Sequence, residues 1–95
     1  MNTIPKFLPV IARYIAPTNS RGPRVKLTYP SLDDRDYATS RVRSWDYGVD
    51  STTVIGQLER RLGACGITPV GIAETAGPDV IAFVRFDQAE LLNKL

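Results

Sequence analysis

Few residues of this chain could carry out acid–base or nucleophilic chemistry. The 95 residues include no histidine, so the commonest general base and metal ligand is missing. The single cysteine, Cys65, stands between Ala64 and Gly66, where a small buried thiol that packs is favoured over a reactive one. Acid, base or nucleophile would have to come from Asp, Glu, Tyr, Ser, Lys or Arg. The sequence therefore predicts a binding protein and no enzyme.

Metal and cofactor sites are predicted to be absent. Asp33, Asp34 and Asp36 offer oxygen ligands, but they lack the spacing and the distal Glu of a calcium loop. Arg35 offsets their charge, so a solvated acidic turn is the favoured interpretation. The pair Gly63 and Gly66 lacks the lysine of a nucleotide-binding loop.

A turn-rich segment between the first two apolar runs is a candidate anion site. In Asn19-Ser20-Arg21-Gly22, successive main-chain N–H groups of a tight turn could face a phosphate, with the side chains of Arg21 and Arg24 alongside. An ordinary surface loop is the alternative.

Basic residues alternate along two neighbouring predicted strands. Arg24 and Lys26 share one side of the strand predicted over 24–29, and Arg41 and Arg43 share one side of the strand predicted over 39–45. If the strands pair, we expect these four cations to gather on one face, with an aromatic ring in phase for base stacking. The predicted nucleic-acid-binding residues are Arg13, Asn19, Arg21, Arg24, Lys26, Arg41, Arg43 and Trp45. The alternatives are a solvated face or a protein interface, with Trp45 folded inward.

Period-two alternation predicts the strands that would position these residues. Strands are expected at 7–15, either starting after Pro9 or with Pro9 at an edge, and at 24–29, 39–45, 67–74 and 80–86. The last two flank a Gly-Pro-Asp turn and should form a hairpin.

Two helices are expected from apolar spacing and capping residues. Asp50 or Ser51 can cap a helix whose apolar stripe is Val54, Ile55, Leu58 and Leu62 and which ends at Gly63 or Gly66. A capping box at Asp87 and Glu90 predicts a short C-terminal helix. The predicted fold is one small α+β domain over residues 1–95, a mainly antiparallel sheet with one helix packed on one face and the other face open.

Composition limits the location and the partners. Hydrophobic residues make up 43% of the chain, enough for one core, and a lone cysteine fits a reducing compartment. Neither a secretion signal nor a membrane span is recognisable, so a cytoplasmic protein is expected. Although the net charge is only +2, residues 1–32 hold five basic residues and no acidic one. This asymmetry predicts a one-sided electrostatic surface.

One segment resembles small, functionally uncharacterised proteins of bacteriophages and other mobile elements. In those proteins a Tyr leads into Pro-Thr-Asn-x-Arg-Gly-x-Arg-Ile/Val-Lys, as Tyr14 here leads into 17–26; Pro23 stands where a small polar residue is expected. The resemblance implies a viral accessory protein in the host cytoplasm, with a shared surface at Asn19, Arg21, Gly22, Arg24 and Lys26.

Two functions fit these observations. The first is non-catalytic binding of nucleic acid, expected to be single-stranded DNA or RNA, through the basic face and loop. The alternative is a protein-interaction module, such as a counter-defence inhibitor of a host protein or a small homodimer. It would use an open sheet edge or the apolar C-terminal residues Leu91, Leu92 and Leu95.

Overall fold

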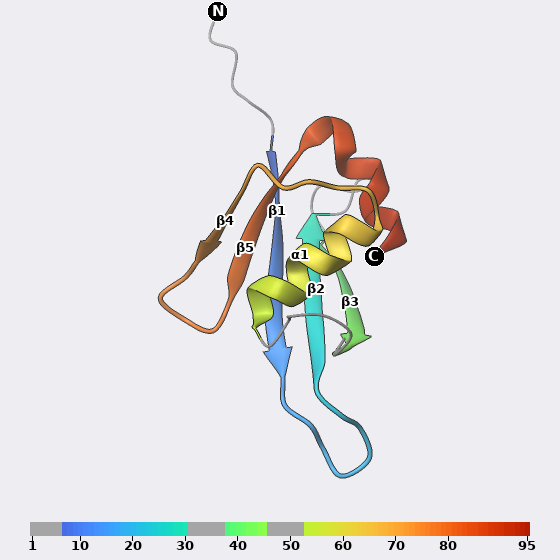
Figure 1. Cartoon of the computed structure of the whole chain (residues 1–95), viewed down its shortest axis with the longest axis vertical. Helices are drawn as coiled ribbons and strands as arrows, with labels where there is room; N and C mark the ends of the chain where they lie inside the picture. Colours follow the sequence, from blue (N-terminus) through green and yellow to red (C-terminus); the bar gives the residue numbers. More distant parts are fainter. Residues whose placement is uncertain (1–6, 31–37, 46–52) are drawn as a thin grey trace, which may run out of the picture.

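The computed structural model describes residues 7–30, 38–45 and 53–95. They form a five-stranded antiparallel sheet of strand order β3-β2-β1-β5-β4, an α-helix and a C-terminal 3-10 helix (Figure 1). The elements are β1 (Phe7–Ile15), β2 (Arg24–Pro30), β3 (Ala38–Ser44), α1 (Val54–Ala64), β4 (Gly71–Glu74), β5 (Val80–Arg85) and the 3-10 helix η1 (Phe86–Lys94). The predicted α+β arrangement is confirmed.

β1 is the central strand although it contains a proline. Its pairing with β2 begins at Ile11, whereas Pro9 is opposite Phe83 of β5. Pro9 therefore lies where β1 has a paired neighbour on one side only, and its missing N–H takes no bond from the β1–β2 ladder.

α1 packs across one face of the sheet through the predicted stripe. Leu58 and Leu62 are fully buried, and Val54 and Ile55 pack against the core. The helix begins after Thr53, whose Oγ1 accepts a hydrogen bond from the main-chain N of Gly56 at 3.1 Å. The predicted caps at 50 and 51 lie outside the described residues.

The C-terminus of α1 ends in a Schellman motif. The N–H of Ile67 donates to the carbonyl of Leu62 at 2.9 Å, and that of Gly66 donates to Gly63 at 3.0 Å. Gly66 has φ +81°, in the left-handed region that favours glycine. Ile67 is then buried against the core, so the motif fixes both the end of the helix and the direction of the chain after it.

Gly66→Ala is expected to lower the free energy of unfolding by about 1–2 kcal/mol, because a Cβ disfavours left-handed backbone. Gly22→Ala is the control: Gly22 lies outside that region, and a Cβ there meets no atom within 4 Å. Denaturant melts of both variants test this; equal stability of the two would contradict it.

β4 is shorter than predicted. The strand expected over 67–74 begins only at Gly71, because the Schellman motif commits Ile67 to the core. The N–H of Val70 still donates to the carbonyl of Phe83 at 2.8 Å, which leads the chain into the hairpin.

The C-terminal helix forms as a 3-10 helix without the predicted capping box. No side chain caps η1, and the Asp87 carboxylate instead accepts from Nη2 of Arg85 at 3.0 Å. Leu92 and Leu95 are buried and Leu91 packs against the core. Leu92 and Leu95 are therefore part of the core and are not exposed on the surface of the described domain.

One core lies between the sheet and the two helices. Its sheet side consists of alternate residues of the three central strands: Val10, Ala12, Val25, Leu27, Tyr29, Val80, Ala82 and Val84. α1 and η1 cover this face, and both contact β1 and β5. We call the opposite face, which neither helix covers, the open face. No helix among the described residues is long and apolar enough to cross a membrane.

Candidate functional site

The register of β2 and β3 divides the predicted basic face between two sides of the sheet. Arg43 is opposite Val25 and Arg41 is opposite Leu27, both buried core residues. Directly opposed residues share a face, so Arg41 and Arg43 lie on the helix side. Arg24 and Lys26 are opposite Ser44 and Val42, on the open face. The prediction that these four cations gather on one face is wrong.

Arg41 and Arg43 make internal hydrogen bonds on the helix side. Nε of Arg41 donates to the Tyr29 hydroxyl at 3.1 Å, and Nη2 of Arg43 donates to the main-chain oxygen of Leu95 at 2.6 Å. These bonds tie β3 to β2 and to the end of η1. Their role here is structural.

Trp45 also lies on the helix side. It is half-buried, packs against the core, and meets Tyr14 edge-to-face with ring centroids 5.3 Å apart. The alternative of an inward tryptophan is the correct one. Trp45 is in phase with Arg41 and Arg43, so assigning the tryptophan to the core would have placed those two arginines on the helix side.

Two arginines cap the exposed edge of β3. The N–H of Trp45 donates to the carbonyl of Pro23 at 3.0 Å, which fixes the pattern of the ladder and points the carbonyls of Val42 and Ser44 outward. Arg43 donates to the carbonyl of Val42 at 3.1 Å, and Arg61 donates to the carbonyl of Ser44 at 2.9 Å. The side chains thus occupy acceptors that an added strand would need.

Among the described residues, four cations lie on the open face. Arg85 is at one end, opposite Phe7, and Arg13, Arg24 and Lys26 lie together and are called the basic block. Arg13 is opposite Lys26, and Arg24 is opposite Ile15 in the next open-face row. Arg13 and Lys26 are exposed, and Arg24 is half-buried. The block brings together three of the predicted residues, from two strands.

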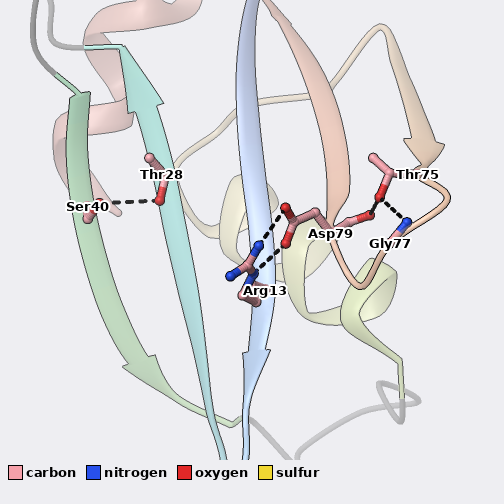
Figure 2. Close-up of polar contacts among 6 residues, drawn as sticks. All are labelled: Arg13, Thr28, Ser40, Thr75, Gly77 and Asp79. Atoms are coloured by element: carbon pink, nitrogen blue, oxygen red, sulfur yellow. Dashed lines mark hydrogen bonds and ion pairs between the residues drawn. The ribbon is translucent and has the colours of Figure 1, made fainter.

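Asp79 lies beside the basic block. Arg13 donates from Nε to Oδ1 at 2.6 Å and from Nη2 to Oδ2 at 3.0 Å, as Figure 2 shows on the side of the sheet away from α1. These hydrogen bonds hold the pKa of Asp79 below its usual range and raise that of Arg13. The carboxylate stays ionised and offsets the repulsion between Arg13 and Lys26.

Hydroxyl groups continue the open face toward β3. The side chains of Thr28 and Ser40 are hydrogen-bonded at 3.3 Å across β2 and β3 (Figure 2). The turn between β4 and β5 is closed by Thr75, whose hydroxyl donates to the carbonyl of Asp79 at 2.8 Å and accepts from the N–H of Gly77 at 3.2 Å. This turn positions Asp79 against Arg13.

An uncovered apolar group, not predicted from the sequence, adjoins the basic block. It consists of Phe7, Pro9, Ile11, Ile81 and Phe83, which we call the apolar block. Phe7 and Phe83 expose 43% and 40% of their surface. They are diagonal neighbours across β1 and β5, about 7–8 Å apart by sheet geometry. The sequence signal was that Phe83 is out of phase with the buried Val80, Ala82 and Val84.

The loop between β1 and β2 has one main-chain N–H already in use. The N–H of Arg21 donates to Thr18 Oγ1 at 3.2 Å, and no residue of this loop has a positive φ. Asn19 and Arg21 are exposed in this loop. Arg21 and Arg24 do come together, because both line a hollow between the loop and the ends of β2 and β3.

The remaining candidates for chemistry are placed as follows. Cys65 is buried beside the end of α1, and burial raises the pKa of its thiol, which disfavours the reactive thiolate. Asp33, Asp34 and Asp36 lie outside the described residues.

No family model matches the chain, and no curated protein or solved structure is significantly similar to it. The open face must therefore be interpreted from its own chemistry.

Proposed function

We propose that this chain is a non-catalytic accessory protein of phage type that binds single-stranded nucleic acid on its open face. The observation that carries the proposal is the pair of exposed rings, Phe7 and Phe83, beside the basic block on an uncovered antiparallel sheet. Cations that contact the backbone, with aromatic rings for the bases, are what a single strand requires.

Charge on the open face favours a polyanion. Arg24 and Lys26 make no ion pair with another described residue, and Asp79 is the one acidic side chain that contacts the basic block among the described residues. Each cation that meets a phosphate releases condensed counterions, which supplies salt-dependent affinity without base specificity.

The dimensions of the face suit a short stretch of strand. β1 crosses the whole face, and its nine residues span about 27 Å at about 3.4 Å per residue. The basic block lies toward one end and the two phenylalanine rings toward the other. A strand that follows β1 would therefore have its backbone over the cations and bases on the rings.

Titration of a labelled oligonucleotide of about twelve nucleotides tests the proposal, with single-stranded and duplex DNA and RNA compared by anisotropy. We expect the single strand to bind more tightly than the duplex, since stacking needs unpaired bases. Each phosphate contact is expected to add about −0.7 to the slope of log affinity against log salt. Absence of binding to every oligonucleotide at low salt would refute the proposal.

The apolar block supports a second candidate, a protein partner. Five adjoining apolar side chains on an uncovered sheet are typical of an interface as well as of a stacking platform. A host protein or a second copy of the chain would then bury the block, and a specific complex would persist in high salt during size-exclusion chromatography. The capped edge of β3 makes the sheet face the better candidate for this contact than the edge.

The resemblance of 14–26 to phage proteins and the lone cysteine lead us to propose the host cytoplasm as its location. Nucleic acid is present there in single-stranded form whenever it is copied, transcribed or degraded.

A further inference from the structure

A hollow of about 570 Å³ opens beside the basic block, in the size range of about 300–1,000 Å³ typical of ligand pockets. It is lined by residues of the β1–β2 loop and the facing ends of β2 and β3: Arg21, Gly22, Pro23, Arg24, Val42, Arg43, Ser44 and Trp45. Arg43 already donates to the main-chain oxygens of Val42 and Leu95, which leaves Arg21 and Arg24 as the arginines free to meet a ligand. The hollow adjoins the last row of the open face, in which Arg24 is opposite Ser44.

No described residue neutralises the positive charge in the hollow. None of its lining residues is acidic, and neither Arg21 nor Arg24 forms an ion pair with another described residue. Nε of Arg24 is buried and has no hydrogen-bond partner in the part of the chain that the structure describes. A buried donor left unpaired is unfavourable, so the guanidinium would gain from an anionic acceptor in the hollow.

The loop that forms one wall is held in place independently of any ligand. The N–H of Thr18 donates to the carbonyl of Arg21 at 2.8 Å, and the carbonyl of Pro23 accepts from Trp45. Both guanidiniums therefore extend from main chain that is already fixed, which lowers the cost of ordering them on binding.

We propose that this hollow binds the terminal phosphate of a nucleic-acid strand lying on the open face; the inference rests on the proposed function. A phosphate monoester carries a charge of about −1.5 to −2 at neutral pH, which two arginines match, whereas an internal phosphodiester carries one. Arg24, which lines the hollow, is opposite Ile15 at the end of β1, so a strand that follows β1 would have its terminus beside the hollow.

The test compares otherwise identical single strands that carry a 5′ phosphate, a 3′ phosphate or hydroxyls at both ends. One phosphorylated strand is expected to bind about tenfold more tightly than the hydroxyl-ended strand. Trp45, the only tryptophan, lines the hollow, so its emission should change with that strand alone. The preference should shrink at about pH 5, below the second pKa of the monoester near about 6. Inorganic phosphate should abolish the preference only in large excess, since it lacks the contacts of the attached strand.

Arg21→Ala is expected to reduce the ratio of the two affinities to about one. Its side chain is exposed and its main chain keeps both bonds to Thr18, so the variant should fold. Arg85→Ala is the matched control, because Arg85 lies opposite Phe7 at the far end of the open face and should leave the ratio unchanged.

Each outcome decides between the two proposals. Equal binding of all three strands to the parent protein overturns the hollow as a phosphate site and leaves the open-face function intact. A preference that survives in both Arg21→Ala and Arg24→Ala also overturns it. No binding of any strand overturns the proposed function and this inference with it.

Discussion

A chain that ends after Gln88 is expected to lose cooperative unfolding. Such a chain lacks Leu92, which is fully buried, and Ala89 and Leu95, which are also buried. Removing one buried leucine side chain costs about 2–5 kcal/mol, and a domain of this size is stabilised by about 5–15 kcal/mol in total. The truncation also removes the main-chain oxygen of Leu95 that accepts a hydrogen bond from Arg43, so β3 would lose its connection to η1. Near-ultraviolet circular dichroism and urea melts measure the effect.

Point variants of η1 test how much single side chains contribute to stability. Leu92→Ala is expected to lower the free energy of unfolding by about 2–5 kcal/mol, whereas Glu90→Ala, on the exposed side of η1, should change it by about 0.5 kcal/mol or less. A shortened chain as stable as the parent would show that η1 contributes nothing to the core. Because these leucines are buried, any loss of partner binding in the shortened chain reports unfolding and not the loss of an interface.

Replacing Arg24 and Lys26 together by alanine is expected to weaken binding of single strands by about one to two orders of magnitude at low salt. The loss should be the same for every base sequence, because these side chains would contact phosphates. The slope of log affinity against log salt should become shallower by about 1.4, about 0.7 for each phosphate that a cation no longer neutralises. Anisotropy titrations at several salt concentrations measure both quantities.

Arg41→Ala is the control that separates the two sides of the sheet. It removes the bond to the Tyr29 hydroxyl, so we expect a loss of about 1 kcal/mol in stability and no change in salt slope. Asp79→Asn should act in the opposite direction to the double variant, with a steeper slope, since it frees Arg13. A double variant that binds like the parent, or an Arg41→Ala variant that flattens the slope, would exclude the open face as the binding surface.

The candidate site was only half predictable from the sequence. Arg24 and Lys26 alternate with the apolar residues Val25 and Leu27 along β2. Because a strand alternates between its faces, this pattern correctly placed the two cations on the side away from the core. Arg41 and Arg43 were assigned to the wrong side. Their strand has polar residues in both phases, so its alternation does not indicate which phase faces the core.

The aromatic part of the site was missed for a similar reason. Phe83 lies in a run of apolar residues, where alternation is weak and every residue is a candidate for the core. Phe83 pairs with Pro9 across β1 and β5, and this register places its ring on the open face.

The sequence by itself determined the elements and their order, because turn residues, capping groups and period-two or helical spacing act over a few neighbouring residues. The stripe of α1 and the turn between β4 and β5 are such local features. The tertiary structure alone decided which side chains share a face, where Trp45 points, and that η1 completes the core. These depend on the register between strands, and a slip of one residue would move every side chain of a strand to the opposite face.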